Sequence, residues 1–349
     1  SYPALRMDRG AYKDWKFHTI FFDEAQAFKN PATQTAKAVK ELQARHRFAL
    51  TGTPIENSLD ELWSIFNVVF PALLPDRSQF AELRNADIAK RVQPFLLRRT
   101  KAEVLGEVPQ KIERIEHSEL HEEQKKLYTA YLAELRHEAL KHLRDNSMRK
   151  NRIRILAGLT RLRQLCCHPS LFVEDYRGGS AKFEQLLEIL EEARLTGRRV
   201  LVFSQFTGML NLIGQSLLRS GRSYFYLDGS TPPKERVELC DRFNEGEEDL
   251  FLISLKAGGT GLNLTGADTV ILYDLWWNPA VEQQAADRAH RMGQKWEVQV
   301  LRLVAKGTIE EKMYDLQLRK QDLVDEMIQS GSEAVQSMSE EDIREILMI

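Results

Sequence analysis

The chain has 349 residues, of which 43% are hydrophobic and 29% are charged. This length allows two or three ordinary domains, and the composition excludes a disordered or fibrous protein. The formal net charge of -2, from 49 basic and 51 acidic residues, neither favours nor excludes nucleic acid as a partner. No apolar run reaches the length of a membrane span, and the first residues lack the pattern of a signal peptide.

The apolar segments near the N-terminus predict strands of a parallel sheet. Residues 17–22 and 48–50 are apolar, and residues 33–45 between them have a helical pattern. A strand–helix–strand unit of this kind is typical of parallel α/β sheets. Residues 59–70 follow as an amphipathic helix, and residues 80–97 as a mixed helical region.

The middle of the chain predicts a linker and then a basic helical region. Residues 103–118 read as a linker that contains one extended strand, and residues 122–167 have helical periodicity. Residues 136–164 carry nine Arg or Lys and two acidic residues, a local net charge of +7. A run of this kind is either a solvated helix face or an electrostatic footprint for phosphates, and both interpretations stay open.

A second alternation of helices and strands begins after the glycine pair at residues 178–179. The helices are expected at residues 181–195, 207–220 and 232–245, and the strands at residues 200–203, 224–227, 250–253 and 269–273. This order predicts an α/β fold, with a parallel sheet covered by helices on both faces. Residues 309–328 read as a charged helix, and the acidic residues 331–349 are expected to be poorly ordered.

Polar side chains follow the first two strands. Asp23 and Glu24 lie at the carboxyl end of an apolar strand, where open α/β sheets bind ligands. Asp23 could hold Mg²⁺ through water, and Glu24 could orient or deprotonate an attacking water. Thr51, Gly52 and Thr53 end the next strand and should lie beside the acidic pair. Each of these segments alone is also typical of an ordinary strand end or turn.

The second half carries a glycine-rich segment and two arginines. Glycines in residues 254–264 let backbone amides approach a phosphate or sugar closely: Gly258, Gly259 and Gly261. On a helix, Arg288 and Arg291 would share one face, from which two guanidinium groups could contact a γ-phosphate. The alternative interpretation is a surface helix that is ion-paired through Asp287.

Eight segments in order resemble the Swi/Snf-type ATPases of helicase superfamily two. They read DEAQ, TGTP, LRRTK, LVFSQF, LDGST, SLKAGGTGLNL, WNP and QAADRAHRMGQ, and they span about residues 17–320. The resemblance implies RecA-like parallel sheets with helices on both faces, with a partial first lobe, a complete second lobe and helical insertions. It implies the following domains: lobe 1 in residues 1–116 with an insertion at about 59–100, a helical protrusion of lobe 2 in 117–177, lobe 2 in 178–310, and a helical brace with an acidic tail in 311–349.

The resemblance also implies roles for single residues. Asp23 and Glu24 match the Mg²⁺ and water-activating pair, and Arg288 and Arg291 match arginine fingers. Nucleotide contacts are implied for Gln284, Gly259, Gly261 and Thr53, and coupling of hydrolysis to lobe movement for Thr51, Gly52 and Thr53. DNA contacts are implied for Ser230, Thr231, Lys256, Gly258, Trp277, Arg149, Lys150, Arg152 and Arg154. The implied cofactors are ATP and Mg²⁺, and the implied partners are double-stranded DNA and a DNA-bound protein complex, with no membrane.

The three cysteines predict no metal or disulfide chemistry. Cys166, Cys167 and Cys240 cannot form a disulfide framework, and they provide no pair of CxxC motifs for zinc. This usage predicts a reducing, intracellular setting. Cys166, Cys167 and His168 lie in a segment that resembles the family's LRxxCxHP, so they are interpreted as structural residues.

The sequence departs from the family pattern in two places. DEAQ stands where DEAH or DEGH is commoner, which looks like bacterial members and implies a cytoplasmic, nucleoid-associated protein. No Gly-Lys dipeptide occurs anywhere in the chain, so the P-loop is absent from it. The expectation is a C-terminal portion of the enzyme that is inactive alone. A strand-separating DNA or RNA helicase and a non-hydrolysing DNA-binding module remain as alternatives, although the insertions, LRRTK and LRxxCxHP favour the translocase.

Overall fold

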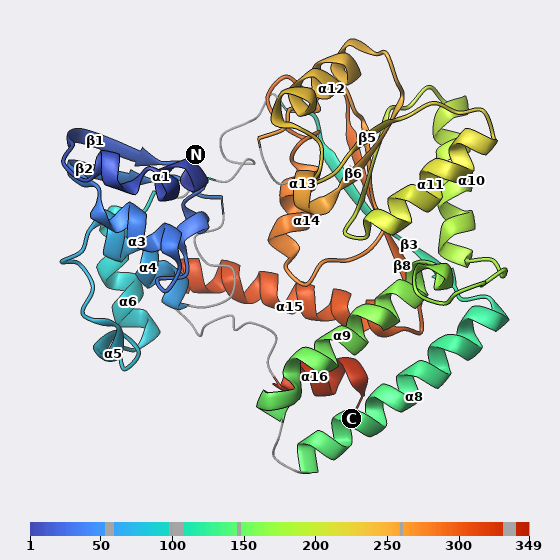
Figure 1. Cartoon of the computed structure of the whole chain (residues 1–349), viewed down its shortest axis with the longest axis horizontal. Coiled ribbons are helices and arrows are strands. Elements are labelled where there is room, and N and C mark those ends of the chain that lie inside the picture. The colour runs from blue at the N-terminus through green and yellow to red at the C-terminus, as the bar shows by residue number, and fades with distance from the viewer. Residues whose placement is uncertain are drawn as a thin grey trace. The chain divides into compact units, whose positions relative to one another are not determined.

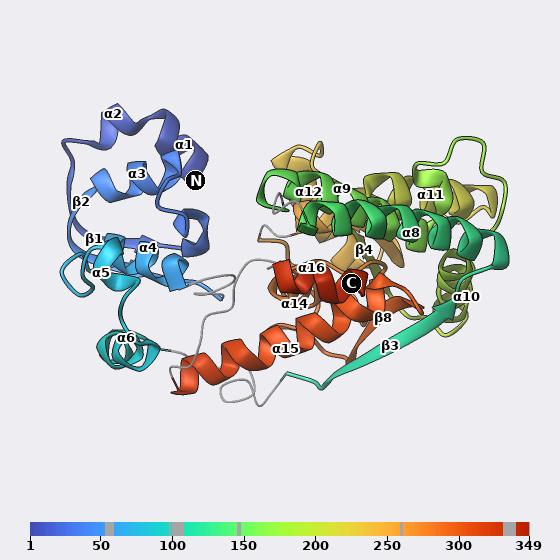
Figure 2. The same ribbon diagram turned by 90° about the horizontal axis from the view of Figure 1, so that it is seen from below.

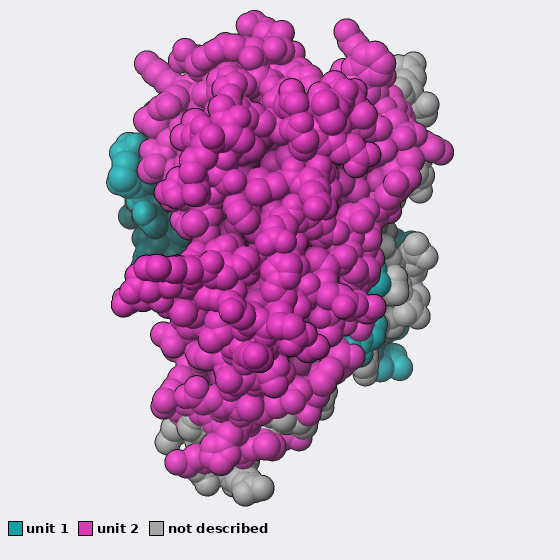
Figure 3. Space-filling view, turned by 90° about the vertical axis from the view of Figure 1, so that its right-hand side faces the viewer, with its two compact units in different colours: residues 1–99, 318–339 teal, residues 100–317, 340–349 magenta. Residues whose placement is uncertain are grey.

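A computed structural model describes most of the chain (Figure 1). It covers residues 1–52, 59–97, 99, 108–144, 148–258, 261–330 and 340–348, without the side chains of 142–144, 148–150, 152, 320–330 and 340–341. Two compact units form, residues 1–99 with 318–339 and residues 100–317 with 340–349, coloured separately in Figure 3. Within the described residues, no helix combines the length and apolar character needed to cross a membrane.

Unit 1 is built on a parallel strand pair. Strands β1 (Lys16–Phe22) and β2 (Gln43–Ala49) pair from Lys16–Gln43 to Phe22–Ala49, and α3 (Gln34–Glu41) connects them. This confirms the predicted strand–helix–strand unit. β2 begins before the predicted residue 48, because its polar first residues still pair with β1. The other described elements of this unit are α1 (Tyr2–Met7), α2 (Arg9–Tyr12), η1 (Ala25–Phe28), α4 (Leu59–Val69), α5 (Arg77–Phe80), α6 (Asn85–Val92) and η2 (Gln93–Phe95).

Apolar side chains hold α3 and α4 against the strand pair. The hydroxyl of Thr33 caps α3 by accepting a hydrogen bond from the backbone N–H of Ala36 at 3.2 Å. Val39 of α3 and Ile65 of α4 are buried in the same cluster as Phe22 of β1. The predicted amphipathic helix over residues 59–70 is therefore confirmed, and its apolar face supports the end of β1.

Unit 2 contains a six-stranded parallel sheet in the order β3-β8-β7-β4-β6-β5. Its strands are β3 (Lys111–Glu119), β4 (Val200–Ser204), β5 (Phe225–Leu227), β6 (Leu250–Ser254), β7 (Thr269–Leu272) and β8 (Val298–Lys306). The four predicted strands of the second half are confirmed to within one residue at each end. Every residue of β4, β6 and β7 is buried, as expected for a parallel sheet covered on both sides.

Helices cover both faces of this sheet (Figure 1). One face packs against α10 (Ala181–Leu195) and α11 (Thr207–Arg219). The other packs against α12 (Pro233–Glu245), α13 (Leu255–Gly258) and α14 (Pro279–Ala286). Within β4, Val202 joins the first core and Leu201 the second, because successive side chains point to opposite faces. The predicted RecA-like α/β fold is confirmed.

The sheet includes two strands that the sequence analysis placed differently or missed. β8 was not predicted at all, although its run of Val, Leu and Ala, interrupted only by Gln299 and Arg302, is typical of a buried strand. β3 was predicted as an extended strand of a linker, but it pairs with β8 along its whole length, from Lys111–Val298 to Glu119–Lys306. The expected end of lobe 1 at residue 116 therefore falls inside a strand of the second unit's sheet.

A pair of long helices extends from this sheet. Helices α8 (Glu122–Arg144) and α9 (Met148–Cys167) lie side by side, as Figure 2 shows, and confirm the predicted helical region. Helix η3 (Pro169–Leu171) follows α9. Near the C-terminus, α15 (Ile309–Ser330) confirms the predicted charged helix.

The acidic C-terminal residues include an ordered helix. Residues 340–349 were expected to be poorly ordered, but α16 (Glu340–Leu347) forms and buries Ile343, Ile346 and Leu347. The carbonyl of Leu347 accepts a hydrogen bond from Nε of Arg136 on α8 at 2.6 Å. An apolar face on this short helix therefore outweighs its acidic composition. Residues 331–339 lie outside the described part of the chain.

Candidate functional site

The acidic pair lies where β1 ends beside β2. The backbone N–H of Leu50 donates to the carbonyl of Phe22 at 2.8 Å, and that of Ala25 donates to the carbonyl of Leu50 at 3.0 Å. Glu24 adopts a left-handed backbone conformation with φ 49° and ψ 51°. Its N–H donates to Oδ1 of Asp23 at 2.9 Å, so the turn holds both carboxylates at the carboxyl edge of the strand pair.

Gln26 joins the acidic pair to the segment after β2. Its Nε2 donates to Oε2 of Glu24 at 2.6 Å, and its Oε1 accepts from the hydroxyl of Thr51 at 2.7 Å. The predicted proximity of Thr51 to the carboxylates is confirmed, whereas the role of Gln26 was missed. Its place two residues after Glu24, in the segment DEAQ, was the available signal. Gly52 is described and exposed, and Thr53 lies outside the described residues.

The electrostatics of this edge favour a cation. The hydroxyl of Tyr2 donates to the backbone carbonyl of Asp23 at 2.6 Å. Burial, followed by the charges of Asp23 and Glu24, raises the pKa of Tyr2 to about 12. Both carboxylates are exposed, and hard carboxylate oxygens suit Mg²⁺, which keeps several waters and needs only one or two protein carboxylates. The residues present therefore fit the predicted Mg²⁺ position at Asp23.

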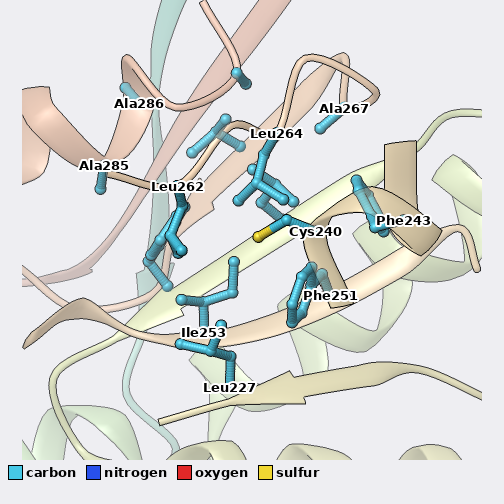
Figure 4. Close-up of a cluster of buried hydrophobic side chains, with 14 of the residues drawn as sticks. Leu227, Cys240, Phe243, Phe251, Ile253, Leu262, Leu264, Ala267, Ala285 and Ala286 are labelled. Atoms are coloured by element: carbon cyan, nitrogen blue, oxygen red, sulfur yellow. The ribbon is translucent and has the colours of Figure 1, made fainter. Parts of the chain in front are cut away.

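In unit 2, the glycine-rich segment meets the arginine segment. The backbone N–H of Leu264 donates to the carbonyl of Arg288 at 3.0 Å, and Nη1 of Arg291 donates to the carbonyl of Leu262 at 3.3 Å. Leu262 and Leu264 also point into the core that holds the end of α14 (Figure 4). The positive φ of Gly261, 59°, lets the backbone turn at this point. Hydrogen bonds and a shared apolar core thus join the glycine-rich segment to the arginine segment, which are separate in the chain.

The two arginines do not share a helix face, which corrects the sequence interpretation. Helix α14 ends at Ala286, and a turn at residues 287–289 and a bend at residues 290–291 follow it. The N–H groups of Arg288 and Ala289 bond to carbonyls three residues back, at 3.2 Å each, so the helix tightens and stops. Arg288 and Arg291 are positioned by this turn and by the glycine-rich segment. Gln284 is half-buried and remains on the helix itself.

A buried carboxylate anchors α14. Glu282 is 1% exposed and accepts hydrogen bonds from the backbone N–H of Trp276 at 2.6 Å, Nε2 of Gln317 at 2.9 Å and Nε of Arg302 at 3.2 Å. Burial raises the pKa of Glu282, and the charge of Arg302 opposes that rise. Glu282 was not predicted as a site residue from the sequence, because an acid in the first turn of a helix is ordinary.

The predicted DNA-facing residues of the sheet lie at the carboxyl ends of its strands. Lys256 follows β6, is exposed, and places Nζ 6.0 Å from the ring centroid of Trp276. Trp277 follows β7 and is half-buried. Ser230, which is exposed, and Thr231, which is half-buried, follow β5 in a loop. In parallel α/β sheets this edge is where ligands bind.

The loop after β5 is held by Asp228. Its Oδ1 accepts from the N–H of Ser230 at 2.8 Å and from the hydroxyl at 2.6 Å, while its own N–H donates to the hydroxyl of Thr231 at 3.1 Å. Hydrogen bonds from Ser230 lower the pKa of Asp228, against the effect of burial. Both predicted DNA-contacting hydroxyls are therefore already engaged with Asp228, that of Ser230 with its carboxylate and that of Thr231 with its backbone N–H.

The charge of the basic run is not all available to a ligand. Arg154 is 72% exposed but pairs with Glu138 of α8, and Arg163 is 1% exposed. Gly258 ends α13. The remaining predicted positions in these segments, or their side chains, lie outside the described residues: Arg149, Lys150, Arg152 and Gly259.

The cysteines fit the predicted structural role. Cys166, Cys167 and Cys240 are buried and free, and burial raises the pKa of each thiol. Nδ1 of His168 accepts the backbone N–H of Ser170 at 3.2 Å, which caps η3. Across the described residues, no group of three or more His, Cys, Asp or Glu side chains is placed to hold a metal ion.

Comparison with known proteins identifies two family models in chain order. An SNF2-related domain matches residues 1–171, and a helicase conserved C-terminal domain matches residues 181–293. A putative ATP-dependent helicase/translocase of Bacillus subtilis, YwqA, is 37% identical over 100% of this chain and 40% of its own length. A helicase of Mycoplasma pneumoniae, named as an uncharacterized ATP-dependent helicase, is 39% identical over 98% of this chain and 34% of its own length. The chain thus spans between a third and two fifths of these relatives.

A solved structure extends the similarity to the fold. The SWI2/SNF2 ATPase core of Sulfolobus solfataricus, solved in complex with double-stranded DNA, has a TM-score of 0.56 and 33% identity. The match covers 99% of this chain and 75% of that core. The order of both family models and the coverage of this core agree with the eight sequence motifs, and the chain belongs to the SWI2/SNF2 family of ATPases.

Proposed function

We propose that the chain is the C-terminal portion of an ATP-dependent translocase that moves along double-stranded DNA. Asp23 would hold the Mg²⁺ of ATP and Glu24 would orient the attacking water, while Arg288 and Arg291 would contact the γ-phosphate. Alternating closure and opening of two lobes would step the protein along DNA without necessarily separating its strands. The duplex in the Sulfolobus complex supports this choice of partner.

The observation that carries the proposal is the arrangement of the carboxyl edge of the six-stranded sheet. The candidate DNA contacts at residues 230–231, 256 and 277 follow β5, β6 and β7. The segment that follows Lys256 is hydrogen-bonded to Arg288 and Arg291. A movement of the arginine turn on ATP hydrolysis would therefore reach Lys256, the contact that precedes this segment in the chain.

The proposal includes low activity for this chain alone. Phosphoryl transfer depends on positioning and charge stabilisation of the triphosphate, and the chain contains no Gly-Lys dipeptide to serve as a P-loop. ATP turnover should be undetectable with or without duplex DNA, and an Arg288→Ala variant should behave identically. Turnover that duplex DNA stimulates and that Arg288→Ala abolishes would contradict this part of the proposal.

Duplex binding is tested by fluorescence anisotropy with labelled duplex and single-stranded DNA of several sequences. Binding should favour the duplex, ignore sequence and weaken steeply with salt, because it rests on backbone phosphates. Lys256→Ala should weaken it. Arg194→Ala is the matched control, since Arg194 is an exposed cation on α10 that pairs with Glu191. Equal affinity for Lys256→Ala and the parent chain would contradict the proposed contact.

The alternatives give different results in the same assays. A strand-separating helicase should prefer DNA with a single-stranded tail. A non-hydrolysing DNA-binding module should bind duplex equally well with and without Glu24→Gln, tested in a longer protein. In the proposed translocase, Glu24→Gln in that longer protein should abolish duplex-stimulated hydrolysis.

A further inference from the structure

Arg163 is a charged side chain enclosed in the second unit. It lies on α9 within the otherwise apolar core side of that helix and is 1% exposed. Its guanidinium carbon is 5.0 Å from the ring centroid of Trp277 and 5.6 Å from that of Phe206. Its Nη2 donates a hydrogen bond to the backbone carbonyl of Leu275. A side chain that long and fully charged is rarely buried unless its charge is paired.

The charge of Arg163 is paired with that of Asp274. Asp274 in turn bonds two residues of the LVFSQF segment, Ser204 and Gln205. Nη2 of Arg163 is 3.9 Å from Oδ1 of Asp274, which is also 1% exposed. The same carboxylate accepts from Nε2 of Gln205 at 2.8 Å and from the hydroxyl of Ser204. Arg163 therefore contacts the segment between β7 and α14 at three points: the carboxylate of Asp274, the carbonyl of Leu275 and the ring of Trp277.

We propose that Arg163 is a positioning residue for Trp277, and that it links the basic helix α9 to the DNA-facing edge of the sheet. This proposal rests on the proposed duplex binding. The guanidinium ties the backbone before Trp277 while it stacks near the indole, so the ring keeps one orientation. A shift of α9 on contact with phosphates would move Trp277 with it.

The geometry requires arginine at this position. A planar guanidinium stacks on aromatic faces and donates several hydrogen bonds in its own plane, whereas an ammonium is a compact point charge. Lysine could retain the pairing with Asp274 but could not also stack between two rings and bond the carbonyl of Leu275. Arg163→Lys is thus the variant that preserves charge and removes positioning.

The test is a double-mutant cycle on duplex binding, measured by anisotropy with the full chain. Trp277→Ala and Arg163→Lys should each weaken binding at least about fivefold, the effect of losing one interface side chain that contributes to affinity. The double variant should bind the duplex as tightly as the single variant that has the lower affinity, because Arg163 acts through Trp277. Affinity within about twofold for Arg163→Lys, or losses that multiply in the double variant, would overturn the proposal.

Arg222→Lys is the matched control, because it makes the same replacement at another arginine that bonds a carbonyl and a carboxylate. Arg222 also bonds a backbone carbonyl, that of Leu190 at 2.8 Å, and lies 3.3 Å from a carboxylate, Asp249. It precedes β5 and so lies at the amino ends of the strands, whereas Trp277 follows β7 at their carboxyl ends. Arg222→Lys should leave duplex affinity unchanged, and an equal loss there would assign the effect of Arg163→Lys to general destabilisation.

A spectroscopic readout separates this proposal from the proposed function. The fluorescence of Trp277 is obtained as the difference between the parent chain and Trp277→Phe, and Arg163→Lys should change that difference spectrum. Phe206→Leu, which leaves all charges in place, should change it in the same way if Arg163→Lys fails to fold. A chain that binds no duplex but shows these changes would refute the function and retain the positioning role. An unchanged difference spectrum in both variants would refute the positioning role.

Discussion

The hydroxyl of Thr51 donates a hydrogen bond to the side-chain carbonyl of Gln26 over 2.7 Å. The amide of Gln26 donates in turn to Glu24 at 2.6 Å, so a residue that follows β2 is connected to the carboxylate expected to activate water. This connection fixes the orientation of the Gln26 amide, since one end must donate and the other accept.

A double-mutant cycle should detect this link. Gln26→Ala and Thr51→Val remove its two sides, and their effects on the free energy of unfolding of unit 1 should be less than additive by about 1 kcal/mol. Urea denaturation monitored by circular dichroism measures it. Gln26→Ala combined with Thr19→Val, whose hydroxyl bonds His18 instead, should be additive. Additivity in both pairs would contradict the link.

The buried ion pair between Lys182 and Glu310 should be essential for the stability of unit 2. Both side chains are 0% exposed, and Nζ of Lys182 also donates to the carbonyl of Tyr273 at 3.3 Å. Lys182→Met leaves a buried carboxylate without its partner and should cost about 3–5 kcal/mol. Urea denaturation of the full chain measures the loss.

Replacing both partners supplies the control for that prediction. Lys182→Met combined with Glu310→Leu removes both charges and should recover most of the lost stability. Arg194→Ala breaks an exposed pair with Glu191 and should change stability by less than about 1 kcal/mol. A double variant as unstable as Lys182→Met would show that the hydrogen bonds of Glu310, and not its charge, are decisive.

The loop after β5 should loosen at acid pH. The pKa of Asp228 is lowered in the folded protein, chiefly by the Ser230 hydroxyl, so its stabilising contribution is present above its ordinary pKa of 3.8 and is lost as pH falls through the folded value. Ser230→Ala should raise the pKa of Asp228, measured by carboxyl-carbon NMR. Ser223→Ala removes a hydroxyl that bonds Glu248 instead and should leave Asp228 unchanged.

Two glycines in the turns that connect elements of unit 2 should respond oppositely to alanine. A Cβ on Gly266 would lie 2.9 Å from the Cα of Asn244 and 2.7 Å from Nη1 of Arg199, so Gly266→Ala should destabilise by about 1–3 kcal/mol. Gly229 has no atom within 4 Å of such a Cβ and no positive φ. Gly229→Ala should be neutral or stabilise by up to about 1 kcal/mol, because it restricts the unfolded chain. Thermal unfolding compares the two, and equal losses would contradict the crowding at Gly266.

The sequence alone determined the parts of this protein that depend on local pattern. Apolar runs placed the core strands β4 and β6, because a strand buried on both faces must be apolar throughout. Helical periodicity placed α10 to the residue, from Ala181 to Leu195. The order of short motifs identified the family and placed Asp23 and Glu24 at a strand end.

Only the tertiary structure decided what depends on distant partners. The pairing of β3 with β8 joins residues separated by most of the chain, and no local pattern encodes that choice. The burial of Arg163 and Glu282 could not be read from composition, because a charged residue is stable inside only where other elements supply its counter-charges and hydrogen bonds. The arginine segment also depends on a distant partner. The spacing of Arg288 and Arg291 suggested a helix, whereas their bonds to the glycine-rich segment hold them in a turn.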